Sequence, residues 1–403
     1  MANIRNDVIL LFAARTVRLF AYGGLSVILA LYLEDTGMSR ETIGLLFTLT
    51  LAGDAGITLW ITTTADRAGR RRMLLLGSML MVAAGAVFAF TGDPALLIAA
   101  AIVGVISPSG NEVGPFLSIE QASLSQLVPS EARTRVFAWY NLAGSLAGAV
   151  GALAGGMLAH GLQHAGFTAL HSYRAVLLGY AGSGLLLMLL FTRLSTDTEA
   201  GVAAPSERRV LGLHRSKSVV LKLSALFGLD AFAGGLVIQS MVAYWFHITF
   251  GADEQMLGAI FFGANILAGA SALLAAKFAA RFGLINTMVF SHIPSNILLC
   301  LVPFMPGLGW AIFVLMLRFS ISQMDVPTRQ SYTMAVVAPD ERAAASGVTT
   351  IARSVGASLS PALGGILLAT PGLMAAPFVA AGGIKILYDL LLYRSFRHAD
   401  RTG

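Results

Sequence analysis

The segment ADRAGRRR, residues 65–72, is a short polar turn between two long apolar runs, 41–65 and 73–91. A helix of about 20 residues crosses a bilayer core of roughly 30 Å, and both runs are long enough to do so. Lys and Arg gather on the cytoplasmic side of membranes, so the three consecutive arginines indicate which side the turn faces. The segment therefore predicts a membrane hairpin whose turn lies in the cytoplasm.

The composition of the whole chain indicates a membrane protein. Of 403 residues, 56% are hydrophobic and 12% are charged, whereas a soluble domain carries about 25% charged residues. The one cysteine, Cys300, excludes a disulfide framework and a cysteine-rich metal or iron–sulfur site. The net charge of +6 comes from basic residues scattered singly between apolar runs, so we expect no nucleic-acid partner.

Similar apolar runs, separated by charged or Gly/Pro-rich turns, continue along the chain. The first run is too long for the core of a cleavable signal peptide and lacks a small-residue cleavage site. We therefore expect an all-α polytopic membrane protein with twelve transmembrane helices. The predicted spans are 8–33, 41–65, 73–91, 95–122, 135–160, 173–193, 218–248, 254–280, 284–303, 308–337, 342–369 and 373–394.

One long polar stretch, 195–217, divides these helices six and six. We predict an N-terminal six-helix bundle over 1–194, a cytoplasmic linker over 195–217 and a C-terminal six-helix bundle over 218–403. The two halves echo each other, because the turn at 65–69 recurs in outline at 279–283. Repeats of this kind place a solute site at the interface between halves.

A second echo has the same rank in each half. Residues 129–131, followed by Gly155-Gly156, recur as residues 339–341, followed by Gly364-Gly365. Each copy surrounds the fifth helix of its half. An internal duplication is the natural interpretation.

The orientation follows from the 27 Lys and Arg residues. Nineteen lie on the side that holds both termini, two lie on the other side, and six lie within spans. The positive-inside rule then predicts cytoplasmic termini. We expect a multi-pass protein of the inner (cell) membrane.

Within the opening turn, residues 66–72 match the Asp-Arg-x-Gly-Arg-Arg core of the signature between helices two and three of the major facilitator superfamily. Thr62 stands where that signature usually has its leading glycine. The chain resembles this superfamily over essentially its whole length, which implies two six-helix pseudo-repeat bundles and alternating access. The resemblance also implies a cytoplasmic gate, in which Asp66 interacts with the start of helix eleven. The implied gate residues are Asp66, Arg67, Gly69, Arg70 and Arg71; for the arginines the alternative is a purely topological charge cluster.

The glycines of helix five are similar to a motif of proton-driven exporters. They are Gly144, Gly148, Gly151, Gly155 and Gly156. The Gly-Pro pair of that motif is missing here, and helix four lacks the arginine that many drug exporters carry. The resemblance is therefore to a bacterial, exporter-like transporter, with export slightly favoured over uptake. Ordinary packing of small residues is the alternative explanation of these glycines.

Ionisable groups inside spans are expensive, so each is a candidate functional residue. We count six of each sign, and this balance favours internal pairing. The basic set is Arg15, Arg18, Arg318, Arg329, Arg353 and Lys385; the acidic set is Asp54, Glu112, Glu120, Asp230, Asp325 and Asp389. The spacing of Lys385 and Asp389, four residues apart, predicts a local pair.

Two helices place their polar residues on one face. In helix ten, Arg318, Ser322, Asp325 and Arg329 follow i, i+4, i+7 and i+11 spacing, and Pro327 permits a kink. Such a face lines an aqueous cavity or pairs with polar groups of neighbouring helices. Helix one also places polar residues on one face, with Arg15, Arg18, Tyr22 and Ser26 at i, i+3, i+7 and i+11.

A buried carboxyl beside arginines can carry a coupled proton, because desolvation and charge pull its pKa in opposite directions. Glu112 is the first choice, with a permanent salt bridge to Arg18 as the alternative, and Asp54 and Asp230 come next. The predicted substrate and proton pathway comprises Arg18, Tyr22, Asp54, Glu112, Glu120, Asp230, Arg318, Ser322, Asp325, Arg329 and Arg353.

We find no motif for a cofactor, a metal or an enzyme. The cluster of His160, His164 and His171 has no Cys, Asp or Glu nearby in sequence, and His292 is interpreted as a core residue. The chain is expected to be a monomeric secondary active transporter of a small organic solute by alternating access, coupled to protons and without a cofactor. The alternatives are a passive facilitator or transceptor of the same fold and a membrane-embedded lipid-modifying enzyme.

Overall fold

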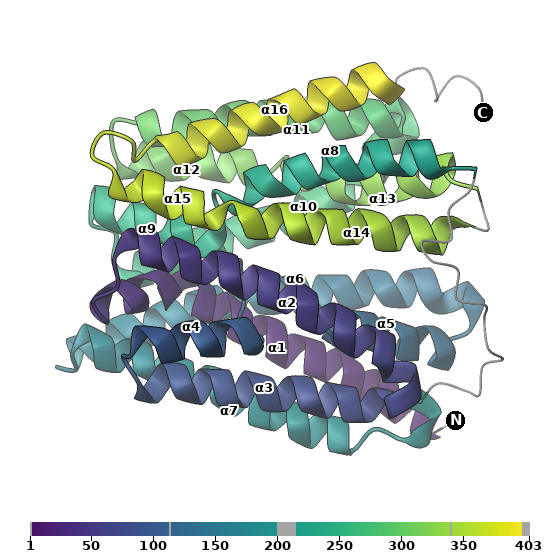
Figure 1. The fold of residues 1–403 in the computed structure, drawn as a ribbon, viewed down its shortest axis with the longest axis horizontal. Coiled ribbons are helices and arrows are strands. Elements are labelled where there is room, and N and C mark those ends of the chain that lie inside the picture. Colours follow the sequence, from purple (N-terminus) through teal and green to yellow (C-terminus); the bar gives the residue numbers. More distant parts are fainter. Residues whose placement is uncertain (1, 113, 200–214, 339–340, 397–403) are drawn as a thin grey trace. The chain divides into compact units, whose positions relative to one another are not determined.

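We describe the protein from a computed structural model that covers residues 2–112, 114–199, 215–338 and 341–396 (Figure 1). These residues form helices and no strands. The helices are α1 (Ala2–Asp35), α2 (Arg40–Ala68), α3 (Arg70–Phe90), α4 (Pro94–Val103), α5 (Phe116–Leu127), α6 (Ser130–His164), α7 (Ala169–Thr192), α8 (Lys217–Gly235), α9 (Gln239–Phe250), α10 (Glu254–Phe282), α11 (Leu284–Leu301), α12 (Leu308–Phe319), α13 (Asp325–Val336), α14 (Arg342–Leu359), α15 (Pro361–Ala369) and α16 (Ala376–Phe396).

The helices gather into two compact units. Unit 1 comprises 1–39, 49–206 and 242–262, and unit 2 comprises 40–48, 207–241 and 263–403. The units follow contacts, so the beginning of α2 belongs to unit 2, and the end of α9 with the beginning of α10 belongs to unit 1. The predicted linker lies largely at 200–214, outside the described residues, and the division at 195–217 stays a prediction.

In unit 1, α1 is the central helix and packs against both α6 and α7. α3 lies along α7, as Figure 1 shows, and the short α4 lies against α3. Between α4 and α5, residues 104–112 and 114–115 form no helix. They include Gly110 and Gly114, whose positive φ values of 69° and 81° favour glycine and end regular helix there.

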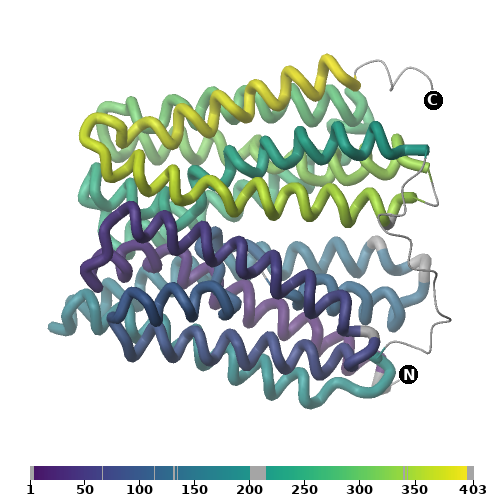
Figure 2. The backbone as a smooth tube through the Cα atoms, viewed as in Figure 1, coloured from purple at the N-terminus to yellow at the C-terminus, as the bar shows by residue number. Residues whose placement is uncertain are grey.

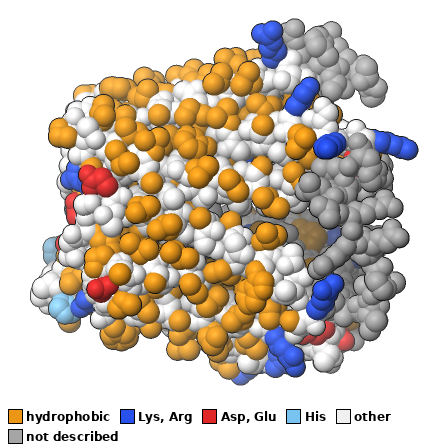
Figure 3. Space-filling view, viewed as in Figure 1, with side chains coloured by type: hydrophobic (Ala, Val, Ile, Leu, Met, Phe, Trp, Pro, Cys, Tyr) orange, Lys and Arg blue, Asp and Glu red, His pale blue; other side chains and the backbone are white. Residues whose placement is uncertain are grey.

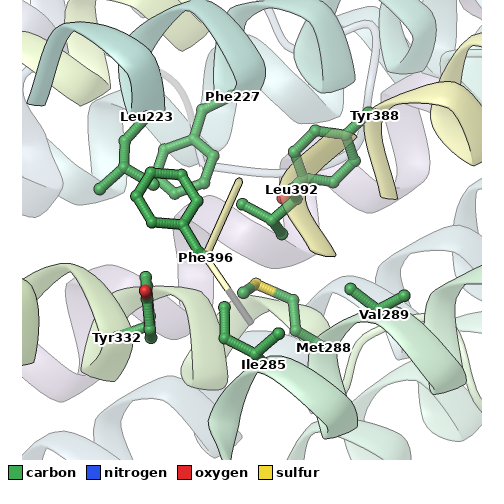
Figure 4. Packing of buried hydrophobic residues seen from close by; sticks show 9 residues of the cluster. All are labelled: Leu223, Phe227, Ile285, Met288, Val289, Tyr332, Tyr388, Leu392 and Phe396. Atoms are coloured by element: carbon green, nitrogen blue, oxygen red, sulfur yellow. The ribbon is translucent and has the colours of Figure 1, made fainter. Parts of the chain in front are cut away.

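In unit 2, α8 packs against α14 and α16, and α11 packs against α16 and α13. Their buried side chains form one apolar cluster, in which Phe227, Tyr332 and Phe396 from three different helices approach Met288 and Leu392 (Figure 4). The cluster residues come from α8, α11, α13 and α16, and the burial of this apolar surface holds these four helices together. The same four helices carry Asp230, His292, Asp325, Arg329, Lys385 and Asp389.

The twelve predicted spans are accounted for by helices of this structure. Ten helical segments of the described chain are long and apolar enough to cross a membrane, and two shorter apolar helices, α4 and α12, begin the predicted spans four and ten. Figure 3 shows hydrophobic side chains over much of the face in view, with the charged ones toward the helix ends. This distribution suits a surface in contact with lipid.

Spans four, seven, ten and eleven differ from the prediction, because each consists of two helices: α8 and α9 in span seven, and α14 and α15 in span eleven, are separated by three residues and one residue. The interruptions in spans four and ten are longer. Span four breaks between α4 and α5, and α4 is visibly shorter than α3 beside it (Figure 2). Span ten breaks at 320–324, between α12 and α13. Pro327 therefore does not kink a helix; it lies in the first turn of α13, where its missing N–H has no partner to lose.

Candidate functional site

A buried ionic network lies inside unit 1. Arg18 of α1 is completely buried and makes a two-pronged ion pair with Glu120 of α5, Nη1–Oε1 at 2.8 Å and Nη2–Oε2 at 2.7 Å. Its Nε donates to Glu112 Oε1 at 2.6 Å, and Glu112 Oε2 lies 3.0 Å from Arg15 Nη1. Tyr140 of α6 donates its hydroxyl to Glu120. Two arginines thus meet two carboxylates, and the network is formally neutral.

The break in span four makes this network possible. In a continuous helix, Glu112 and Glu120 would be separated by more than two turns and would point in different directions. The non-helical stretch brings Glu112 to the Nε edge of Arg18, while α5 presents Glu120 to its Nη edge. Gly144 of α6 gives room for Arg15, because a Cβ there would lie 2.5 Å from Arg15 Nε.

A second network lies inside unit 2 and converges on Asp230 of α8. Lys385 Nζ of α16 is 2.6 Å from Asp230 Oδ1, and Arg329 Nη1 of α13 is 3.2 Å from Oδ2. Arg353 Nη1 of α14 reaches the same oxygen at 3.4 Å. Arg329 is shared with Asp325, one turn earlier, at 2.9 Å. Three cations therefore meet two carboxylates, and Arg353, with 36% of its side chain exposed, is the loosest of them.

Next to this network lies a histidine–carboxylate pair. His292 of α11 and Asp389 of α16 are both buried, with Nδ1 and Oδ1 2.9 Å apart. Asn296, one turn after His292, donates Nδ2 to the other carboxylate oxygen at 3.2 Å. One prediction from the sequence is thereby wrong, because Lys385 pairs with Asp230 rather than with Asp389. His292 is buried, as predicted, and in addition it pairs with Asp389.

Four predicted pathway residues lie apart from direct ion pairs. Asp54 Oδ1 is buried and has no hydrogen-bond partner among the described residues, while Asp54 as a whole interacts with the Gly114 backbone, with Thr58 and with the charge of Glu112. Tyr22 is buried 6.3 Å from the ring of Tyr180 and interacts with Arg18. Arg318 Nε and Ser322 Oγ are buried without partners among the described residues.

The prediction that the four polar residues of span ten share one helical face is wrong. Arg318 ends α12, Ser322 lies in the turn, and Asp325 and Arg329 are in α13. Asp325 nevertheless interacts electrostatically with Arg318 across the break. The structure thus brings Asp230, Asp325, Arg329 and Arg353 together in unit 2, and Arg18, Glu112 and Glu120 together in unit 1.

The predicted gate turn has an anchoring role within unit 1. Gly69, at φ 97°, separates α2 from α3. The Glu199 carboxylate accepts hydrogen bonds from the backbone N–H of Arg70 at 2.6 Å and of Arg71 at 3.2 Å, at the positive end of α3. Arg71 also donates to the carbonyl of Thr192 at 2.5 Å.

The remaining gate residues divide into two cases. Arg67 is exposed to solvent. The side chain of Asp66 lies outside the described residues, so its interaction with helix eleven stays a prediction. The gate therefore stays a prediction, and the structure shows only the anchored start of α3.

Close helix contacts occur at the glycines of the second echo. A Cβ on Gly156 of α6 would lie 3.0 Å from the Cα of Gly258 in α10, within unit 1. A Cβ on Gly365 of α15 would lie 2.8 Å from the Cα of Gly44 in α2, within unit 2. The duplicated glycines thus have the same structural role in both copies, because each allows two helix backbones to come into contact.

A polytopic all-α fold with two buried ionic networks defines a membrane transport protein, and comparison with known proteins agrees. A model of the Major Facilitator Superfamily matches residues 11–361, and this chain belongs to that superfamily. It is 31% identical over 425 aligned positions to the uncharacterized membrane protein YJR124C of Saccharomyces cerevisiae, covering 98% of this chain and 95% of that protein.

Solved structures share the fold. A crystal structure of a mutant of the nucleoside transporter NupG matches with TM-score 0.78 and 14% identity over 96% of this chain and 99% of that one. A D-xylose–proton symporter matches with TM-score 0.70 and 15% identity over 96% and 97% of the two chains. The predicted superfamily and fold class are confirmed, and the chain is a multi-pass membrane transporter.

Proposed function

We propose that this chain is a secondary active transporter that moves a small organic solute by alternating access and is driven by a proton gradient. The observation that carries the proposal is the Asp230 network, in which one carboxylate holds three cations at 2.6, 3.2 and 3.4 Å. Buried ion pairs are strong only with good geometry, so a crowded network is easily rearranged. Proton coupling needs ionic bonds that break and re-form in each cycle.

The same network supports an acidic or zwitterionic solute. Arg353 has the longest ion pair and the most exposed side chain of the three cations, so it can leave Asp230 for a solute carboxylate at the lowest cost. Arg318 has a buried Nε without a partner among the described residues. Both guanidinium groups interact with Asp325, which places them in one electrostatic neighbourhood.

Proteoliposomes with an imposed pH gradient test the proposal. The panel contains labelled nicotinate as anion, carnitine as zwitterion, uridine and D-xylose as neutral solutes, and tetraphenylphosphonium as cation. We expect the pH gradient to drive nicotinate or carnitine and an uncoupler to abolish that flux. If probes cross the membrane but none of their fluxes depends on the pH gradient, the result would favour a passive facilitator. The glycines of α6 keep export as the expected direction, which reversal of the gradient measures.

A further inference from the structure

The buried carboxylates differ in the kind of base that they meet. Glu112, Glu120, Asp230 and Asp325 each have an Arg or Lys nitrogen at 2.9 Å or closer. Arginine and lysine keep their charge at physiological pH, so these four carboxylates have a permanent counter-charge. Asp389 has no Arg or Lys ion pair in the described part of the chain, and its charged partner is the imidazole of His292.

Histidine is the side chain that gains and loses its proton near neutral pH. When His292 is protonated, the pair with Asp389 is neutral as a whole. When His292 loses its proton, a negative charge remains on a completely buried side chain. Asn296 donates to the second oxygen of Asp389 but carries no charge, so it cannot replace the positive charge that His292 loses with its proton.

The surroundings of His292 connect this proton to the Asp230 network. The charged groups that face the imidazole are Asp389 and Lys385 from α16, Asp325 from α13 and Asp230 from α8. Tyr388 of α16 stands edge-on to it, with ring centroids 6.1 Å apart. Lys385 and Asp389 are one turn apart on α16, so the Lys385 ammonium can serve either Asp230 or Asp389.

We propose that the His292–Asp389 pair is the binding site of the transported proton, and that Lys385 relays its state to Asp230. With the proton bound, Lys385 remains on Asp230, as the structure shows at 2.6 Å. With the proton released to water, Lys385 turns toward the uncompensated Asp389 and leaves Asp230 to its two arginines. The inference rests on the proposed function, because it identifies where the coupling proton resides.

The first test follows the proton itself. The full chain, in lipid nanodiscs and with ¹⁵N-labelled histidine, is titrated by NMR, and His292→Gln identifies the His292 signal among seven histidines. We expect this signal to titrate reversibly as the pH is changed. Asp389→Asn is expected to move its midpoint by about tenfold or more in proton concentration, and Lys385→Gln to move it measurably.

Matched controls are present in the chain. Asp253 is a carboxylate 3.7 Å from His160, with 52% of its side chain exposed, and Asp253→Asn should leave the His292 midpoint unchanged. A second control is His247→Gln, which removes a histidine whose Nδ1 lies 2.8 Å from the Ala252 carbonyl oxygen. This variant should also leave the His292 midpoint unchanged. If His292→Gln does not fold, stepwise replacement of the other histidines assigns the signal in a protein with an intact pair.

Cys300 provides an independent readout without any added label. It lies on α11, two turns after His292, and packs against Gly382 of α16. If the proton state shifts α11 against α16, the rate of Cys300 alkylation by a maleimide should differ at least twofold between the wild type and Asp389→Asn at the same pH. Equal rates at every pH would contradict the relay.

The outcomes separate this inference from the proposed function. A His292 signal that does not titrate, or that ignores Asp389→Asn, overturns the inference. So does full gradient-driven flux of nicotinate or carnitine in His292→Gln. A responsive His292 in a protein whose fluxes ignore the pH gradient would leave the proton site standing and refute the proposed energy coupling.

Discussion

Arg18 shows how much one buried residue depends on its partners. Its side chain is completely buried and is held by both oxygens of Glu120 and one oxygen of Glu112. We expect Glu120→Gln to lower the yield of folded protein strongly, because stranding one charge of a buried pair costs on the order of 3–5 kcal/mol. The measurement is the fraction of monodisperse protein after extraction in detergent, together with its Tm.

Glu112 offers a matched comparison for the same arginine. Its side chain is 13% exposed, and Glu112→Gln leaves the two-pronged pair between Arg18 and Glu120 intact. Glu112→Gln also removes the ion pair of Arg15 but leaves the hydrogen bond from Arg15 to Asn141. We therefore expect the Glu112 variant to lose less folded protein than Glu120→Gln and to show its main defect in transport. Equal losses of folded protein in both variants would show that Arg18 does not distinguish its two carboxylates.

A substitution at Asp54 tests whether a buried carboxylate without a basic partner is ionised. In the described part of the chain, Asp54 Oδ1 is buried without a partner, and the charged group with which Asp54 interacts is another acid, Glu112. If Asp54 is held neutral for lack of a counter-charge, Asp54→Asn should cost less than about 1 kcal/mol, because amide and protonated carboxyl have similar shape and polarity. A large drop in Tm, beyond that of Glu112→Gln, would indicate an ionised and stabilising Asp54.

Residue pairing is where the sequence was least informative. The i, i+4 spacing predicted a bond between Lys385 and Asp389, yet α8 and α11 supply stronger partners to each. Spacing along one helix identifies neighbours on that helix only, whereas a buried charge pairs with whichever helix packs closest. The set of buried charges could be predicted from hydropathy, but their partners depend on tertiary packing.

At the scale of helices, close contact between backbones gives the next prediction. Gly156 has no space for a methyl group, since its Cβ would lie 3.0 Å from the Gly258 Cα, whereas Gly161 on the same helix has nothing within 4 Å. Gly156→Ala should push α6 away from α10 and lower the Tm, at a cost of about 1–3 kcal/mol. Gly161→Ala is the control and should leave the Tm unchanged or slightly raise it. Identical Tm values for both variants would show that the α6–α10 contact is not tight in the membrane protein.

The anchored start of α3 is a second prediction at this scale. Glu199→Gln keeps one acceptor oxygen but loses the negative charge at the positive end of α3 and one of its two hydrogen bonds. We expect a loss of about 1 kcal/mol and faster proteolysis in the 192–199 segment. Asp197→Asn, at an exposed side chain of the same segment, is the control. Unchanged proteolysis of Glu199→Gln would mean that the arginine bonds alone hold this segment.

The helix breaks show why the ends of helices could not be predicted from the sequence. Gly110 and Pro115 signal an interruption in span four, and the structure places one there. In span ten, Pro327 suggested a kink, but the break lies earlier, where the backbone N–H of Gln323 donates to Ser271 Oγ of α10 at 3.2 Å. A helix can end wherever another element satisfies its freed backbone groups, and no local residue reveals that partner.

At the scale of the whole molecule, duplication explains the placement of function. The longer breaks have the same rank in each half, in the fourth and tenth spans, and each lies beside a buried ionic network. Discontinuous helices at corresponding positions of two repeats are a physical signature of binding sites in transporters. Unit 1 has diverged to two arginines facing two carboxylates, while unit 2 has an extra cation and the histidine pair. The duplicated framework was therefore predictable, and the division of chemistry between its copies was not.

The orientation of the chain in the membrane is the prediction that concerns the molecule as a whole. Nineteen Lys and Arg residues lie on one predicted side and two on the other, a bias large enough to fix topology during insertion. Alkaline phosphatase fused after Leu33 should be active, because the charge bias predicts that this point lies outside. Green fluorescent protein fused after Leu194 should fluoresce, because the same bias predicts that this point lies in the cytoplasm. Exchanging the two reporters is the control and should silence both. Active phosphatase after Leu194 would place the arginines of the 66–72 turn outside, and the six-and-six arrangement with cytoplasmic termini would have to be abandoned.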